Sequence, residues 1–432
     1  MGKHLPIIAS IVVFATVAGT VPSEGAAASL GYGPRGPMSI YQYPLIRLPR
    51  NPRGYRNGVR RPAQPSPGAI KQYRGQELFQ AIHAKDITAV ETLLKQGADA
   101  NGKDNTGETA LIQAVLTGSV EIVNALLAHG AGVNGVDNDG HTPLMAAAKY
   151  QSPAMLAPLL AKGAAVNTQE SGGYTALILA AGAGKEENIS PLLDKQADVN
   201  LKTKEGFTAL IVAAGTGNAP IAKLLLDKGA DPKAVDILNN TALMASAQAG
   251  DAATARLLLA KGVAVNAADK DGYTALMLAA RAGKPNLVSL LIDGGADVKP
   301  KNKDGYTAFL MAVRGGSVPA ATALLDKGAD SKEKDSGGNT ALIHASKYDR
   351  PEMVTFLIDK GLDVNAANSA GETPLITAAK SGCPGVIPVL LSNGADASVK
   401  DASGSSAAMW ADKMGYPDIV KLLPAHGRAA RG

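Results

Sequence analysis

A five-residue pattern, G-x-T-x-L, returns every 33 residues through most of this 432-residue chain. No insertion interrupts the register between copies, so the pattern constrains the fold more than any other feature. A fixed period of this length is typical of solenoids, in which each small unit buries its apolar face only by stacking on its neighbours. Complete copies begin at Gly107, Gly140, Gly173, Gly206, Gly272, Gly338 and Gly371, and variant copies begin at Asn239, Gly305 and Gly404.

The residue types within one period predict two short helices. The threonine of the pattern can cap a helix with its hydroxyl. Pro143 and Pro374 then stand at the first helical position, where a missing N–H costs nothing. Alanine pairs such as Ala279 and Ala280 allow close helix contact, which suits a chain with only 4% aromatic residues. A glycine near the end of nearly every period, such as Gly295, fits a left-handed helix end.

These motifs resemble the ankyrin repeat, whose pattern G-x-T-P-L-H-x-A-A is followed by a second helix and G-A-D-x-N. Gly272-Tyr-Thr-Ala-Leu276 and Gly295-Ala-Asp297 show both parts in one unit. The resemblance covers about residues 71–432. It implies an all-α solenoid of about eleven helix-turn-helix units with β-hairpin tips, starting near residues 71, 104, 137, 170, 203, 236, 269, 302, 335, 368 and 401.

Some positions depart from the family pattern. The histidine after T-P-L is absent from every copy and is usually replaced by isoleucine or methionine, as at Ile112 and Met277, which predicts apolar packing in place of an inter-repeat hydrogen bond. The first unit lacks the turn motif and the last carries polar residues at Asp412 and Lys413, so both are interpreted as caps. Prolines predicted to lie inside second helices should each kink the helix at a cost of up to about 3 kcal/mol; they are Pro158, Pro191, Pro388 and Pro424.

Residues 1–28 have the three parts of a secretory signal peptide. Lys3 is followed by an apolar run from Leu5 to Thr20 and then by Ala26-Ala27-Ala28, which predicts cleavage before Ser29. The run is shorter than the roughly 20 residues of a membrane-spanning helix, although an uncleaved anchor stays an alternative. We therefore expect an exported protein, in the periplasm or secreted.

Residues 29–70 are rich in Pro, Gly, Arg and Tyr without apolar periodicity, which predicts a disordered linker. Residues 25–74 contain nine basic and no acidic side chains. Subtracting these nine charges from the net +5 leaves about −4 for residues 75–432. This cationic arm could contact anionic lipid or an envelope polymer, or serve only as a spacer. Nucleic acid is disfavoured as a partner because the protein is expected to be exported.

No pattern of catalytic, cofactor-binding or metal-binding residues emerges. The six histidines form no i, i+4 pair, and Gly-Lys at 184–185 is followed by Glu186 rather than the Ser or Thr of a phosphate-binding loop. Aspartates such as Asp104 and Asp335 recur with the repeat, where they fit turns better than a calcium site. Cys383 is the only cysteine; an inert residue is favoured there over an exposed, oxidisable thiol. We predict no enzyme activity, no cofactor and no metal.

The family resemblance implies that partners bind in the concave groove, against the tips and first helices. Aromatic side chains beside basic ones form a candidate strip for an acidic or peptide-like protein surface. Phe207, Ile237, Leu238 and Tyr273 are the hypothesised core, although tyrosine at a tip could equally be a packing residue of the repeat. The remaining candidates are Tyr174, Tyr306, Tyr150, Tyr348, Lys149, Arg281, Arg314 and Lys347.

The sequence is therefore interpreted as a monomeric, non-catalytic, exported scaffold that binds another protein. Chaperoning, sequestering an exported enzyme and inhibiting a toxin are the roles that the resemblance suggests. Two alternatives stay open: a secreted effector that binds host proteins, and a structural spacer that the Arg/Tyr-rich arm anchors to the envelope. Fold alone cannot choose among them.

Overall fold

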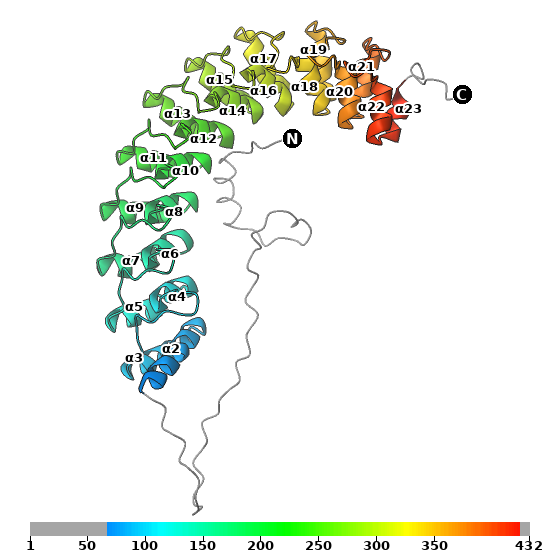
Figure 1. The fold of residues 1–432 in the computed structure, drawn as a ribbon. Helices are drawn as coiled ribbons and strands as arrows, with labels where there is room; N and C mark the ends of the chain where they lie inside the picture. Colours follow the sequence, from blue (N-terminus) through cyan, green and yellow to red (C-terminus); the bar gives the residue numbers. More distant parts are fainter. Residues whose placement is uncertain (1–66, 424–432) are drawn as a thin grey trace, which may run out of the picture.

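The computed structural model describes residues 67–423, with side chains from Arg74 onward. Within this range the chain forms 22 helices and no strand, arranged as eleven pairs that stack into one curved array (Figure 1). The predicted all-α solenoid is confirmed. The predicted signal peptide, residues 1–28, and residues 29–66 of the predicted linker lie outside the described residues. The predicted end of the linker at residue 70 is wrong, because α2 already begins at Pro67. No described helix has the length and apolar character needed to cross a bilayer.

In each pair the first helix lies on the concave side of the arc and the second on the convex side (Figure 1). Units are named below by their first residue, so that unit 302 spans residues 302–334. The inner helices are α2 (Pro67–His83), α4 (Ala110–Thr117), α6 (Pro143–Tyr150), α8 (Ala176–Gly182), α10 (Ala209–Gly215), α12 (Ala242–Ala249), α14 (Ala275–Arg281), α16 (Ala308–Gly315), α18 (Ala341–Lys347), α20 (Pro374–Ser381) and α22 (Ala407–Met414).

The outer helices are equally short and uniform. They are α3 (Ile87–Lys95), α5 (Val120–Ala128), α7 (Pro153–Ala161), α9 (Glu186–Asp194), α11 (Ala219–Asp227), α13 (Ala252–Ala260), α15 (Pro285–Asp293), α17 (Val318–Asp326), α19 (Pro351–Asp359), α21 (Ile387–Ser392) and α23 (Pro417–Leu422).

The motif threonine starts each inner helix from α4 to α20, and Ser406 starts α22. In unit 269 the hydroxyl of Thr274 accepts a hydrogen bond from the backbone N–H of Met277 at 3.3 Å. Such a bond satisfies one of the amides that a helix leaves free at its beginning. Pro143 and Pro374 occupy the first helical positions, as predicted.

Small and unbranched side chains fill the core between units. Ala279 and Ala280 are fully buried, and Met277, at the position of the family histidine, is 1% exposed. The predicted exchange of a polar link for apolar packing is confirmed at this position. Met409, its equivalent in the last unit, is 46% exposed, because no further described unit stacks on α22.

Two prolines lie inside outer helices. Helix α7 continues for three residues beyond Pro158, and α9 continues for three beyond Pro191, so neither proline ends its helix. The prediction for Pro388 is wrong, because α21 begins only at Ile387 and the proline lies in its first turn, where no N–H is needed. Pro424 lies outside the described residues.

A tight turn opens each repeat from unit 104 onward and replaces the expected β-hairpin. In unit 335 the backbone N–H of Asp335 donates to the carbonyl of Asn339 at 3.2 Å. The Asp335 Oδ1 accepts the N–H groups of Gly337 at 2.9 Å and Asn339 at 2.8 Å, which confirms the turn role of the repeated aspartates. Within the described range, the only β-pairing consists of isolated antiparallel bridges that flank three of the turns, at Lys103–Thr109, Val235–Thr241 and Ala268–Thr274.

Neighbouring tips are joined by a ladder of backbone hydrogen bonds. The N–H of Ser336 donates to the carbonyl of Asp304 at 2.9 Å, and the N–H of Lys303 donates to the carbonyl of Asp271 at 2.9 Å. A Cβ on the motif glycine Gly305 would lie 2.5 Å from the Ser336 nitrogen. The glycine is therefore required because two turns touch through their backbones.

On the opposite edge of the tip loops, an asparagine clamps its unit to the next. Asn266 Nδ2 donates to the carbonyl of Gly295 at 3.1 Å, and its Oδ1 accepts the N–H of Asp297 at 2.8 Å. We call this pair of bonds the Asn clamp. It recurs at Asn101, Asn167, Asn200 and Asn365. Lysine stands at this place at Lys233, Lys299 and Lys332, and the side chains of these three lysines form no hydrogen bond within the described residues. Near Lys299, the ion pair between Lys301 and Glu333 joins the same two units.

Candidate protein-binding surface

Five cations, one per unit, stand at the same place near the end of consecutive inner helices. We call them the basic row: Arg281, Arg314, Lys347, Lys380 and Lys413. Arg281, Lys347 and Lys413 are exposed, whereas Arg314 and Lys380 are half-buried. Within residues 74–423, only Lys380 of this row forms an ion pair, with Glu372 Oε1 at 2.5 Å. Units 104 to 236 carry Leu116, Lys149, Gly182, Gly215 and Gln248 at this place.

Arg314 is held between two tyrosine rings. Its guanidinium carbon lies 4.7 Å from the ring centroid of Tyr306 and 5.2 Å from that of Tyr348 in the next unit. Burial raises the pKa of Tyr306 to about 12, against the opposing charge of Arg314, so its hydroxyl stays neutral. Cation–π contacts of this kind fix a flexible cation in one place.

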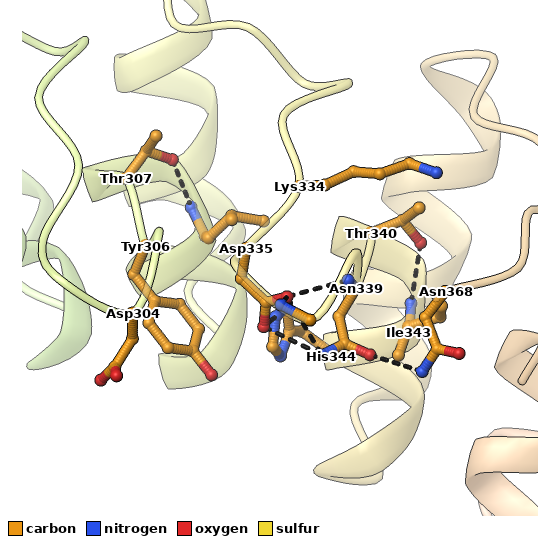
Figure 2. A network of polar contacts seen from close by, with 12 residues as sticks. Asp304, Tyr306, Thr307, Lys334, Asp335, Asn339, Thr340, Ile343, His344 and Asn368 are labelled. Carbon is orange, nitrogen blue, oxygen red and sulfur yellow. Dashed lines mark hydrogen bonds and ion pairs between the residues drawn. The ribbon is translucent and has the colours of Figure 1, made fainter. Parts of the chain in front are cut away.

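A buried, hydrogen-bonded pair of His344 and Asp335 lies beside the Tyr306 ring (Figure 2). The rings of Tyr306 and His344 lie 5.1 Å apart, and His344 Nε2 lies 3.0 Å from Asp335 Oδ2. Burial alone would raise the pKa of Asp335, but hydrogen bonds from His344 and Asn339 outweigh it and lower the pKa to about 2. Asp335 is therefore ionised near neutral pH, and the His344 Nε2 carries the proton that it donates.

The same network continues into the following unit. Asn368 Nδ2 donates to Asn339 Oδ1 at 2.8 Å and to Glu372 Oε2 at 3.1 Å (Figure 2 shows the first contact). Glu372 in turn pairs with Lys380. The surroundings of Arg314 and Lys380 are thus joined through Asp335 and the two asparagines.

A second aromatic side chain in contact with the basic row, Trp410, lies at the end of the array. Lys380 Nζ lies 4.4 Å from its ring centroid and Lys413 Nζ lies 4.7 Å away. Its indole N–H donates to Asp401 Oδ2 at 2.7 Å. Burial would raise the pKa of Asp401, but hydrogen bonds from Ser403 and Trp410 outweigh it and lower the pKa to about 2.

The structure does not place all four residues of the predicted binding core at the surface. Phe207 is 3% exposed and packs in the hydrophobic core, so its assignment to the surface is wrong. Phenylalanine has no hydroxyl that needs a polar partner or water, so the whole ring can be buried at the tip. Tyr174 and Tyr273, at the same place in other units, are only half-buried. Ile237 is 51% exposed, with Leu238 half-buried beside it.

Lys149 and Tyr150 lie far from the basic row, six units before Lys347 and Tyr348. The Lys149 Nζ lies 4.8 Å from the ring centroid of Tyr150, which is 51% exposed. The usual turn glycine is missing after both Lys149-Tyr150 and Lys347-Tyr348. In each case the turn that follows forms hydrogen bonds with the next unit instead. Asn188 donates to the carbonyls of Ala148 and Gln151, and Asp349 accepts the N–H groups of Gly385 and Val386.

Sequence reasoning missed His344 and Trp410. A signal was present, because both stand nine residues after the aspartate that opens their unit and carry a ring N–H. Gln113 has the same spacing and donates to Asp104 Oδ2 at 3.1 Å. A donor at this place therefore marks a link between an inner helix and its own tip.

The described residues offer little for other chemistry. Cys383 is buried, its Sγ lies 3.3 Å from the carbonyl of Lys347, and burial and the charge of Asp349 raise the pKa of its thiol. The favoured interpretation as an inert residue agrees with this environment. Among residues 74–423, no three histidine, cysteine or acidic side chains lie together where they could hold a metal ion.

The curved stack of helix pairs with aromatic and cationic side chains along its inner helices defines a helical repeat scaffold. The chain belongs to the ankyrin repeat family. A model for three ankyrin repeats matches residues 78–170, 154–236, 231–302 and 276–368, and a model for many ankyrin repeats matches residues 357–409. Ankyrin repeats are protein-binding scaffolds that are generally non-catalytic.

Among solved structures, the crystal structure of the human ASB11 ankyrin repeat domain is similar to this chain. It is 27% identical, with a TM-score of 0.46, over 50% of this chain and 97% of that domain. No match was found among curated protein sequences.

Proposed function

We propose that this protein is an exported, non-catalytic scaffold that binds a partner protein through the concave side of units 269 to 401. The observation that carries the proposal is Arg314 held between Tyr306 and Tyr348 at the end of an inner helix. Tyrosine, tryptophan and arginine are the residues most enriched at the energetic centres of protein interfaces. Here they gather on one side of one half of the array.

The test is capture of partners from the exported fraction with residues 29–432. A variant with Arg281→Glu and Lys347→Glu reverses two exposed charges of the inner helices. A matched control, Lys162→Glu with Lys261→Glu, reverses two exposed charges at the ends of outer helices. We expect the first variant to lose the partner and the control to retain it. Equal capture by both variants would place the binding surface elsewhere.

Export is proposed from residues 1–28 and has its own test. The mass of the protein recovered outside the cytoplasm should correspond to a chain that begins at Ser29. A full-length chain recovered with membranes would support the uncleaved anchor instead. The identity of the captured partner separates the roles: an exported enzyme supports chaperoning or sequestering, a toxin supports immunity, and a host protein supports a secreted effector.

A structural spacer in the envelope is the second candidate, favoured by the nine basic and no acidic residues of 25–74. A chain starting at Pro67 keeps α2 intact and removes most of these charges. Binding to wall polymer or anionic vesicles that disappears on this truncation and at high salt would favour the spacer. Partner binding that survives the truncation would favour the scaffold.

A further inference from the structure

We propose that the basic row binds an extended acidic polypeptide segment in which acidic side chains recur at every third residue. This inference rests on the proposed function and specifies the chemistry of the partner. The segment would run along the inner helices from α14 to α22, across the units that carry the row.

Helix formation does not explain the row. A cation near the end of a helix is favourable through the helix dipole, so a structural origin must be weighed. However, the same inner helix forms in units 104, 170, 203 and 236 with Leu116, Gly182, Gly215 and Gln248 at this place. The charges are therefore dispensable for the fold. Units 104 to 236 carry a single cation at this place, Lys149, whereas all five units from 269 to 401 carry one, and this unbroken run points to a ligand of opposite charge.

The spacing of the row matches an extended chain. Packed helices lie about 8–10 Å apart, so consecutive cations of the row are separated by about that distance. An extended polypeptide advances about 3.3 Å per residue, so three residues span about 10 Å. Acidic side chains at every third residue would meet one cation each, and five cations correspond to a segment of about 13 residues.

Three of the five cations are held in position before a ligand arrives. Arg314 lies between two rings, and Lys380 and Lys413 both contact Trp410. Less side-chain freedom is then lost on binding, which raises affinity. The same contacts cover the ring faces with cations, so stacking of unpaired bases, the main attraction for single-stranded nucleic acid, is obstructed. The surface therefore suits carboxylates better than nucleotides.

One carboxylate already occupies the row. Glu372 Oε1 lies 2.5 Å from Lys380 Nζ, and its other oxygen accepts a hydrogen bond from Asn368. This contact shows how an acidic group fits beside Trp410. It also makes Glu372 an internal competitor of a ligand carboxylate at this cation.

The test uses the chain from Ser29 and two fluorescent peptides of about 13 residues and identical composition. One carries glutamate at every third position, and the other carries its five glutamates in one block, so that only the spacing differs. Fluorescence anisotropy at low salt should show about tenfold or greater preference for the spaced peptide. Equal affinity for both peptides would overturn the proposal, because it would indicate attraction by net charge alone.

Charge removal supplies the second comparison. The variant Arg314→Gln, Lys347→Gln, Lys413→Gln should bind the spaced peptide at least about tenfold more weakly, at about two- to fivefold per cation. The control Lys162→Gln, Lys195→Gln, Lys261→Gln removes the same charge at the ends of outer helices and should stay within about twofold. An equal loss in the control, or tighter binding of an oligonucleotide of equal charge, would overturn the proposal.

The substitution Glu372→Gln should change the affinity for the spaced peptide in the opposite direction. Removal of the competing charge should tighten binding of the spaced peptide by about two- to fivefold, whereas general destabilisation could only weaken it. The two proposals can also fail separately. Suppose that the triple variant still captures the partner of the wild-type chain and binds the spaced peptide as tightly as the wild-type chain does. The scaffold proposal would then stand, and the acidic-segment proposal would be refuted.

Discussion

The Asp335–His344 pair allows a sharp test of the physical account of this surface. In Asp335→Asn, the amide oxygen can still accept the turn N–H groups of Gly337 and Asn339. The amide nitrogen that replaces Oδ2 cannot accept from His344 Nε2 or from Asn339 Nδ2. Asparagine occurs naturally at this place, at Asn302 and Asn368, so the turn itself tolerates it.

The magnitude follows from the pKa of Asp335, which falls from the ordinary 3.8 to about 2 in the folded protein. At 1.36 kcal/mol per pKa unit this corresponds to about 2 kcal/mol of stability. Because the folded pKa is the lower one, this contribution is complete above about pH 5 and is lost as the pH falls through the folded value of about 2. About half of it should be gone at pH 3.

Asp269→Asn is the matched control at the same place in another unit. Burial and the charge of Asp271 raise the pKa of Asp269 despite its turn hydrogen bonds. Its ionisation therefore costs stability at neutral pH, and the exchange should be neutral or slightly stabilising there. Any such advantage should shrink as the pH falls below the folded pKa of Asp269 and vanish below the ordinary value of 3.8.

Urea unfolding followed by circular dichroism at pH 7, 4 and 3 measures both effects as differences from the wild-type chain. Asp335→Asn should destabilise the protein by about 2 kcal/mol at pH 7 and by about half of that at pH 3. A pH-independent loss, or an equal loss in Asp269→Asn, would refute the assignment of this stability to the ionised Asp335.

Other predictions follow from burial and hydrogen bonding. Met277→Ala should cost about 2–5 kcal/mol in urea unfolding, whereas Met409→Ala at the exposed equivalent position should cost well under about 2 kcal/mol; equal costs would contradict the packing account. Asn188→Leu should cost about 1–3 kcal/mol and speed amide exchange at the end of α6, because the carbonyls of Ala148 and Gln151 lose their donor; unchanged exchange there would refute the capping role. Cys383 should react with a thiol reagent only after urea unfolds the chain, and rapid labelling of the native protein would contradict its burial.

The fold was predictable because ten copies of the motif each predict the same pair of helices. Threonine caps, helix-starting prolines and alanine pairs all agree on one arrangement, so an error in one unit is corrected by the next. The turn role of the aspartates followed from their period alone. Pro388 was misplaced because α21 begins late, after a Cys-Pro-Gly stretch that no other unit has.

The binding surface was less predictable, because exposure depends on contacts between units. Phe207 and Tyr306 occupy the same tip position, yet the phenylalanine is buried and the tyrosine is half-exposed beside Arg314. His344 and Trp410 gain their roles through partners nine residues away and through rings or cations of neighbouring units. A single sequence shows at which position of the repeat such residues stand, but it does not show which residues of the neighbouring unit they contact.

The absence of the Asn clamp at Lys233, Lys299 and Lys332 has a mechanical consequence. Two of these three junctions, at Lys299 and Lys332, lie among the units that carry the basic row. Each unclamped junction keeps its tip ladder and its apolar core but lacks the two asparagine bonds. At the Lys299 junction the side chain of Lys301 reaches across to Glu333 and to the carbonyl of Lys334. Lysine side chains are longer and more flexible than asparagine side chains, so these ties fix the two units less rigidly than the Asn clamp does. We therefore expect the junctions along the array to differ in stiffness, and two of the unclamped ones lie in the segment whose pitch must match a bound chain.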